Sequence, residues 1–212
     1  MCIRDSYLTS NQRVDYIIEQ TNYYGYSGER VKGLMFCSSK KEAAALSERL
    51  NLRGYRTIAL SGEDSQEKRE DAIDRLVSDT RSDYLQYILT VDIFNEGVDI
   101  PEINQVVLLR PTQSPIVFVQ QLGRGLRKSK DKEYVVILDF IGNYKNNFMI
   151  PIALSGDRSY NKDNIRRYVL EGERIIPGSS TIHFDEISKK QIFASIDTAN
   201  FADIKLIKDS YK

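Results

Sequence analysis

Five short apolar runs, separated by segments of helical periodicity, constrain the fold of this chain more than any other feature. The runs are continuous and do not alternate with polar residues; they occupy residues 33–37, 55–60, 86–90, 105–109 and 134–139. Strands of a parallel sheet have this character because crossover helices bury both faces of the sheet. The pattern therefore predicts an α/β fold, in which a parallel sheet carries helices on both faces.

Amphipathic segments lie between these runs, where the crossover helices are needed. Helices are predicted over residues 39–53, 65–78 and 114–127, each with apolar residues three or four positions apart. A further helix is expected within residues 7–24, ahead of the first strand. In open sheets of this kind, ligands bind beyond the carboxyl ends of the strands. Polar residues at the ends of the apolar runs are therefore the first candidates for a site.

The strand pattern ends at Phe140, and the remaining chain is predicted to be mainly helical. We divide the chain into a lead-in helix at 1–30, an α/β domain at 31–142 and an accessory extension at 143–212. Residues 1–6 do not join smoothly to the helix predicted after them and are expected to be a cloning or assembly remnant. The chain also stops within a predicted helix, which indicates truncation. The extension is expected to hold helices at 143–154, 161–171, 186–196 and 201–212, and a short strand at 181–184.

Composition indicates no strong electrostatic attraction to nucleic acid by the chain as a whole. Thirty basic and thirty acidic residues cancel, so binding of phosphates would need a local group of charges and backbone amides. One such group exists around a short segment that holds Arg124, Arg127, Lys128, Lys130 and Lys132.

Other sequence features exclude several classes of protein. No apolar run approaches the ~18–20 residues of a membrane span, and the first residues lack the apolar core of a signal peptide. Cys2 and Cys37 lie far apart, Cys37 is expected to be a buried thiol, and a cytoplasmic location fits. His183 is the only histidine, which excludes a histidine-based triad, and no metal site is predicted.

The segment Gln-Gln-Leu-Gly-Arg-Gly-Leu-Arg at 120–127 places Arg124 and Arg127 three positions apart. Residues three apart on a helix share a face, so both guanidinium groups can reach one ligand. A guanidinium is a planar, permanently charged fork that suits phosphate oxygens. The alternative is that these arginines pair with carboxylates of their own domain or lie on a solvated helix face.

This segment resembles motif VI of superfamily 2 helicases, and three other segments resemble further motifs of that superfamily in the same order. Residues 33–39 are similar to motif IV, residues 58–62 to the strand-end loop after it, and residues 88–101 to motif V. The region 31–142 therefore resembles the second RecA-like domain of a superfamily 2 DEAD/DEAH-type helicase. The resemblance implies a RecA-like fold of the P-loop NTPase type.

The resemblance implies that motif VI acts on ATP across a domain cleft. Arg127 is the first choice for an arginine finger at the γ-phosphate, and Arg124 is the second. Gln120 is expected to bridge the cleft by hydrogen bonds, and Gly123 to allow close backbone approach. We therefore assign Arg124 and Arg127 to catalysis, and Gln120 and Gly123 to nucleotide binding.

In motif V, the resemblance implies that Gly97 and Asp99 bind the nucleotide, with Asp99 accepting hydrogen bonds from the ribose hydroxyls. The alternative for Asp99 is a turn residue before Pro101. Many RNA-dependent members have arginine where this chain has Glu96, and histidine where its motif VI begins with glutamine. Both differences favour the DNA-translocating, restriction-type bacterial branch.

Strand-end residues are expected to contact nucleic-acid phosphates: Ser38, Ser39, Ser61, Gly62 and Thr90. Ser39 has an alternative role as the N-cap of helix 39–53, because Glu42 three positions later would complete a capping box. Ser61 and Gly62 have the same alternative with respect to helix 65–78.

Two parts of an ATPase site are missing from the sequence. It contains no G-x-x-x-x-G-K-[ST] segment and no acidic pair after an apolar strand. ATP with Mg²⁺ is therefore expected to be bound mainly by an upstream RecA-like domain of the same protein. We expect the chain to be the C-terminal motor domain of an ATP-dependent DNA helicase or translocase, with RNA not excluded, and to be inactive alone. The alternatives are a non-motor RecA-like module that binds nucleic acid or a partner, and a small-molecule α/β enzyme.

Overall fold

The computed structural model describes residues 11–91, 100–110, 129, 132–140, 151–152, 159, 161–171 and 184–199. Contacts divide the chain into two units. The first holds residues 1–110 and 121–140, and the second holds residues 111–120 and 141–212.

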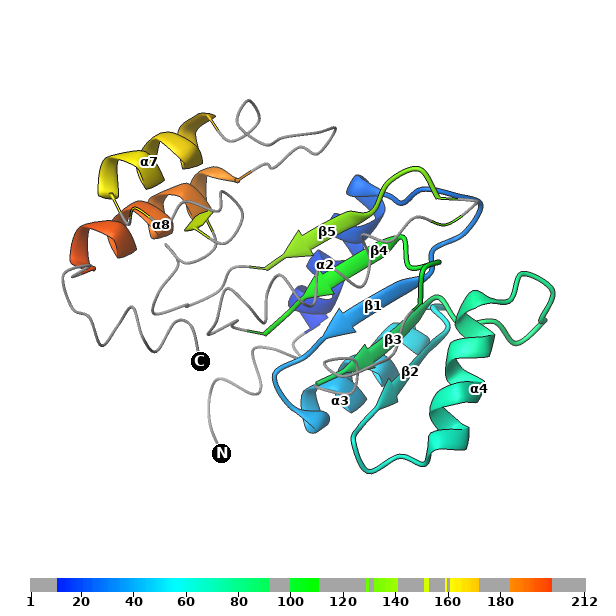
Figure 1. Cartoon of the computed structure of the whole chain (residues 1–212). Helices are drawn as coiled ribbons and strands as arrows, with labels where there is room; N and C mark the ends of the chain where they lie inside the picture. Colours follow the sequence, from blue (N-terminus) through cyan, green and yellow to red (C-terminus); the bar gives the residue numbers. More distant parts are fainter. Residues whose placement is uncertain are drawn as a thin grey trace. The chain divides into compact units, whose positions relative to one another are not determined.

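The first unit is built around a five-stranded parallel sheet (Figure 1). Its strands are β1 (Gly33–Phe36), β2 (Thr57–Leu60), β3 (Tyr87–Thr90), β4 (Gln105–Leu108) and β5 (Val136–Asp139). The spatial order is β2-β3-β1-β4-β5, and every neighbouring pair is parallel. All five strands lie within the apolar runs that predicted them, so the predicted parallel sheet is confirmed.

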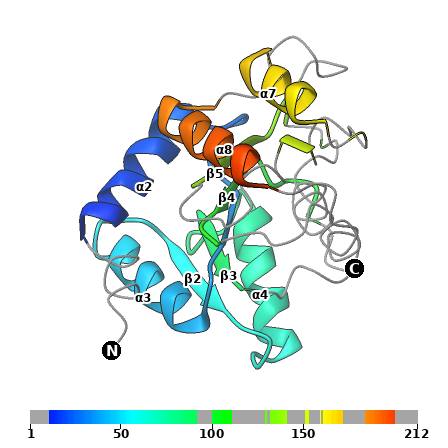
Figure 2. The ribbon, with the colours of Figure 1, turned by 90° about the vertical axis from the view of Figure 1, so that its left-hand side faces the viewer.

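Helices cover both faces of this sheet, as predicted. Helices α2 (Asn11–Tyr24) and α3 (Lys40–Asn51) lie on one face, and α4 (Gln66–Val77) lies on the other (Figures 1 and 2). The helix predicted over 114–127 falls outside the described residues.

The face covered by α2 and α3 holds the larger apolar core. Ile17 of α2 and Leu46 of α3 are buried there against Met35, Leu89 and Val107 of the three central strands. Neighbouring residues along each strand point to the opposite face, which α4 covers. Since α2 contributes to this core, the lead-in helix packs with the sheet as part of the first unit.

The ends of α3 and α4 follow from capping residues in the sequence. The Ser39 hydroxyl accepts a hydrogen bond from the Glu42 amide at 3.1 Å, and the Ser65 hydroxyl accepts one from the Lys68 amide at 3.3 Å. Each bond satisfies an amide that the first helical turn leaves unpaired. Gly54 follows α3 with φ of 87°, a left-handed conformation that glycine adopts without strain.

The second unit contains two described helices, α7 (Lys162–Glu171) and α8 (Glu186–Thr198), which contact each other. They agree with the helices predicted at 161–171 and 186–196. The helix predicted over 143–154 is described only at Pro151 and Ile152, which are helical. The helix at 201–212 and most of the strand at 181–184 fall outside the described residues. No described helix combines the length and the apolar character needed to cross a bilayer.

Gly33 is a position in β1 where a side chain cannot fit. A Cβ atom there would stand 2.3 Å from Cδ1 and 2.4 Å from Cε1 of Tyr87. The Tyr87 ring cannot retreat easily, because it is 3% exposed and its hydroxyl donates to Gln105 at 2.6 Å. We expect Gly33→Ala to lower the free energy of unfolding by about 2 kcal/mol or more, as overpacking of a core does.

Gly62→Ala is the matched control, since a Cβ atom at Gly62 would meet nothing within 4 Å. That substitution should change the free energy of unfolding by no more than about 0.5 kcal/mol. Urea denaturation of both variants measures the difference. Equal stability of Gly33→Ala and the parent chain would show that this packing is wrong.

Candidate functional site

The carboxyl ends of three adjacent strands bring the predicted phosphate-binding residues to one end of the sheet. Ser38 and Ser39 follow β1, Ser61 and Gly62 follow β2, and Thr90 is the last residue of β3. The registers of β1 and β2 with β3 place the last residues of all three strands level with one another. We call this the carboxyl end of the sheet (Figure 1).

At the start of α3, a buried carboxylate binds the first of these residues. Glu42 is 6% exposed, and its Oε2 accepts a hydrogen bond from the Ser38 amide at 2.7 Å. Burial raises the pKa of the Glu42 carboxyl above its ordinary value. Hydrogen bonds from Ser38 and Ser39 and the charge of Arg13 oppose this rise only in part. The N-cap predicted as the alternative for Ser39 is present. A phosphate at this helix terminus would have to compete with Glu42.

The loop after β2 also has a carboxylate that binds the amide of a serine. The predicted alternative of Ser61 and Gly62 as the N-cap of the following helix is wrong, because Ser65 caps α4. The Ser61 amide donates to Oδ2 of Asp64 at 2.6 Å, and Oδ1 of Asp64 pairs with Nζ of Lys68 at 2.5 Å. The hydrogen bonds from Lys68 and from the Ser61 amide lower the pKa of Asp64 to about 2. The Ser61 amide is therefore already bound within the fold.

Gly62 and its neighbour Glu63 contact the first turns of the two helices that follow β1 and β2. Gly62 is exposed, and its carbonyl accepts a hydrogen bond from Nη2 of Arg69 at 2.7 Å. The next residue, Glu63, pairs with Lys40 in the first turn of α3 at 2.5 Å. This exposed ion pair is worth little energy but joins the loop after β2 to the start of α3.

Thr90 and Cys37 lie beneath this surface. Both are fully buried, and the Cys37 amide donates to the Thr90 carbonyl at 2.7 Å. Within the described part of the chain, the Thr90 hydroxyl has no hydrogen-bond partner. Phosphate contact by Thr90 would require this hydroxyl to become accessible, so that role stays a prediction. Burial raises the pKa of the Cys37 thiol, which agrees with the predicted buried cysteine.

Sequence reasoning assigned no role to Arg110, which the fold places at the same end of the sheet. It follows β4, its Nη1 donates to the Val91 carbonyl at 2.6 Å, and its guanidinium lies 5.9 Å from the centre of the Phe36 ring. The signal in the sequence was an arginine directly after an apolar run. Arg110 adds a positive charge near the ends of β1 and β3.

The residues predicted to act on ATP lie outside the described residues, and their roles stay predictions: Gly97, Asp99, Gln120, Gly123, Arg124 and Arg127. Among the described residues, no group of three or more histidine, cysteine or acidic side chains could hold a metal ion.

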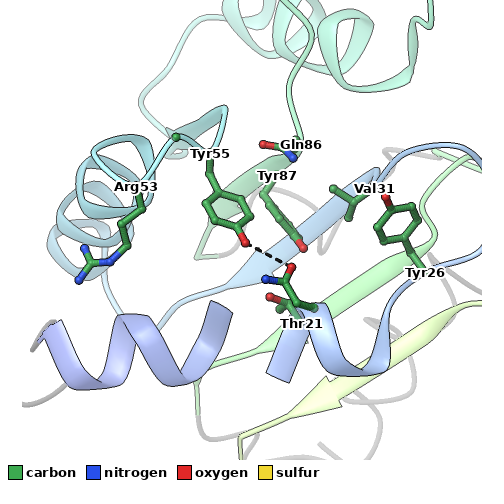
Figure 3. Close-up of a pocket in the computed structure, with 9 residues that line it drawn as sticks. Thr21, Tyr26, Val31, Arg53, Tyr55, Gln86 and Tyr87 are labelled. Atoms are coloured by element: carbon green, nitrogen blue, oxygen red, sulfur yellow. Dashed lines mark hydrogen bonds between the residues drawn. The ribbon is translucent and has the colours of Figure 1, made fainter. Parts of the chain in front are cut away.

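A cavity of about 190 Å³ lies at the opposite, amino end of the sheet (Figure 3). Thr21 and Asn22 of α2 line it together with Tyr55, Gln86 and Tyr87, which precede or begin β2 and β3. The Tyr55 hydroxyl donates to Oδ1 of Asn22 at 3.2 Å. Because it opens where the strands begin, this cavity does not belong with the predicted phosphate-binding residues.

The sequence of the chain matches a known protein family. Residues 12–129, more than half of the 212, match the family described as Helicase conserved C-terminal domain. The chain belongs to this helicase family. The predicted superfamily 2 helicase C-terminal domain is therefore confirmed, while its assignment to the restriction-type branch stays a prediction.

Two similar proteins are named as ATP-dependent helicases. The chain is 27% identical to the putative ATP-dependent helicase IRC3 of Saccharomyces cerevisiae over 155 residues, which are 73% of this chain and 22% of that protein. It is 30% identical to the ATP-dependent RNA helicase SrmB of Haemophilus influenzae over 102 residues, which are 48% of this chain and 22% of that protein. The chain thus spans about a fifth of the length of these relatives.

Solved structures confirm the RecA-like fold. The RNA helicase Prp28 from Chaetomium thermophilum bound to ADP matches with a TM-score of 0.51 and 17% identity, over 76% of this chain and 34% of that chain. The C-terminal part of the Fun30 ATPase domain matches with a TM-score of 0.51 and 14% identity, over 88% of this chain and 55% of that chain. Likeness at these identities concerns the fold alone.

Two substitutions at Glu42 test whether its carboxylate organises the start of α3. Glu42→Ala leaves the Ser38 amide without its acceptor and should lower the free energy of unfolding by about 1–2 kcal/mol. Glu42→Gln keeps an acceptor oxygen and removes the buried charge, so its effect should stay below about 1 kcal/mol. Urea denaturation at pH 7 compares the two. Equal losses in both variants would contradict this role.

Asp64 should make stability depend on pH in the acid range. Its folded pKa of about 2 lies below the unfolded value of about 3.9, so its stabilisation is present above pH ~4 and is lost as the pH falls through about 2. Asp64→Asn should cost about 1 kcal/mol at pH 7, and this cost should fall by roughly half at pH 3. Denaturation midpoints at both pH values measure it; a cost independent of pH would refute the assignment.

Proposed function

We propose that this chain is the C-terminal motor domain of an ATP-dependent superfamily 2 helicase or translocase that acts on nucleic acid, with DNA as the preferred substrate. One observation carries the proposal. In a chain of the helicase C-terminal family, the strand order places exposed Ser38, Ser39 and Gly62 together at the carboxyl end of the sheet. Ligands of open α/β sheets bind at this end.

On the nucleotide side, Arg127 and Arg124 supply positive charge to the γ-phosphate of ATP. Charge builds on the phosphoryl oxygens in the transition state, and a preorganised arginine there raises the rate by roughly 10³–10⁵. Gln120, Gly123 and Asp99 orient the nucleotide. ATP and Mg²⁺ are held mainly by an upstream RecA-like domain. Support comes from the lack of a phosphate-binding G-x-x-x-x-G-K-[ST] segment here and from the greater length of the relatives.

On the nucleic-acid side, the loops after β1 and β2 contact the phosphates of one strand. Because Glu42 and Asp64 bind the Ser38 and Ser61 amides, the contacts come from the serine hydroxyls, from Gly62 and from nearby cations such as Arg110. Glu96 and the glutamine of motif VI favour DNA. The name of SrmB states RNA for that protein. Binding of single-stranded DNA and RNA of one sequence decides between them.

A second candidate is a RecA-like module that binds nucleic acid or a partner without motor function. The missing ATPase elements favour it, since the sequence holds neither the segment that cradles the phosphates nor the acidic pair that holds Mg²⁺. Nucleic-acid binding without any ATP turnover in the full-length protein would support it.

The decisive experiment uses the full-length protein. Arg127→Ala should lower the kcat of nucleic-acid-stimulated ATP hydrolysis by about 10³ or more, because the transition-state charge loses its partner. Arg81→Ala is the matched control. It also removes a guanidinium, but this one pairs with Asp74 of α4 and with Asp83, which follows that helix.

Steady-state ATPase assays with saturating nucleic acid measure both variants, and Arg81→Ala should keep the parental kcat. The isolated chain of 212 residues should show no ATP turnover. Turnover by the isolated chain that disappears in Arg127→Ala would refute the proposal.

A further inference from the structure

Two buried amide side chains at the start of β4 have no part in the proposed function. Asn104 is 3% exposed and Gln105 is fully buried. Burying a side-chain amide is costly unless its donors and acceptors are paired. The partners of Asn104 and Gln105 therefore indicate what these residues do.

Gln105 binds the end of α2. Its Nε2 donates to the Thr21 carbonyl at 3.0 Å and to the Gly25 carbonyl at 2.6 Å, and its Oε1 accepts from the Tyr87 hydroxyl at 2.6 Å. The Thr21 carbonyl also accepts from the Gly25 amide at 3.2 Å, at the end of α2. The Gln105 amide therefore adds a second donor to the Thr21 carbonyl and binds the Gly25 carbonyl just after the helix, which ties the carboxyl terminus of α2 to the sheet.

Asn104 binds the segment between α2 and β1. Its Nδ2 donates to the Ser27 carbonyl at 2.7 Å and to the Arg30 carbonyl at 2.8 Å, and its Oδ1 accepts from the Lys32 amide at 2.8 Å. Together, Asn104 and Gln105 bind the backbone from residue 21 to residue 32 at five points. We call this pair the amide clamp.

The segment that the amide clamp holds is one that would otherwise bend easily. Gly25 and Gly28 both have positive φ, at 64° and 97°, which gives the backbone between α2 and β1 an unusual freedom. Residues that absorb large backbone changes are typical of hinges between domains. The five hydrogen bonds from the amide clamp prevent this segment from acting as a hinge.

Helix α2 is also attached to the rest of the first unit along its length. Ile17 is 1% exposed in the core against the sheet, Asp15 pairs with Arg53 after α3 at 2.7 Å, and Asn22 accepts from the hydroxyl of Tyr55, which precedes β2. The clamp completes this attachment at the carboxyl terminus of the helix.

We propose that Asn104 and Gln105 are positioning residues that make α2 and residues 25–32 one rigid body with the sheet. A force on the amino terminus of α2 then moves the whole sheet and is not absorbed at Gly25 and Gly28. The existence of an upstream domain that exerts this force rests on the proposed function; the rigidity itself does not.

Amide hydrogen exchange on the 212-residue chain tests the rigidity. Gln105→Met keeps a similar volume and removes all three hydrogen bonds. Exchange in residues 14–28 should rise at least about tenfold, while amides of β1 and β3 stay protected. Gln86→Met is the matched control, because Gln86 is an amide at the same end of the sheet whose Oε1 accepts from the Arg56 amide.

The milder Tyr87→Phe removes only the hydroxyl that Gln105 accepts from, and should raise exchange in the same segment by a smaller factor. This variant keeps the test decisive if Gln105→Met does not fold. Unchanged exchange in α2, or a rise spread equally over α2 and the sheet, overturns the proposal.

Kinetics of the full-length protein test the consequence for the motor. Gln105→Met should lower the kcat for nucleic-acid-stimulated ATP hydrolysis several-fold and leave ATP binding unchanged. The reason is that closure of the cleft between the two RecA-like domains would transmit less force through α2 to the sheet. An unchanged kcat would refute this transmission. A full-length parent without ATP turnover would instead refute the proposed function, and the exchange experiment would still decide the clamp.

Discussion

The parallel pairing of β1 with β3 on one side and β4 on the other is the constraint on which the rest of the structure depends. These three strands are buried on both faces, so they can be connected only by segments that cross over the sheet. All strands therefore point the same way, and the two ends of the sheet differ in character. Loops that begin helices gather at the carboxyl end, while the turns that begin strands gather at the amino end.

These two ends have different polar chemistry. At the carboxyl end, Glu42 and Asp64 each bind the amide of the first serine after a strand, which fixes both loops without any ligand. At the amino end, Asn104 and Gln105 bind backbone carbonyls and attach α2 to the sheet. In the proposed function, the first arrangement presents an exposed surface to nucleic acid, and in our further proposal the second transmits movement. A motor domain would need both, because a bound strand is moved only if the lobe that holds it moves as a unit.

Local signals in the sequence were sufficient to predict most elements of the first unit. Continuous apolar runs located the five strands, and the spacing of Ser39 and Glu42 predicted the start of α3. The strand order was not predictable, since the five runs look alike and the order depends on contacts between distant segments. The burial of Thr90 and the partners of Gln105 depend on the same contacts. The sequence alone does not distinguish a polar residue at a strand terminus that contacts a ligand from one that binds the backbone of a helix.

The proposal that ligands bind at the carboxyl end of the sheet can be tested most directly by amide hydrogen exchange of the full-length protein. The exchange pattern would be compared with and without a non-hydrolysable ATP analogue and single-stranded DNA. We predict added protection in the loops at 38–40 and 61–64, with residues 25–32 at the amino end unchanged. Protection confined to the amino end of the sheet, with both loops unaffected, would contradict the account.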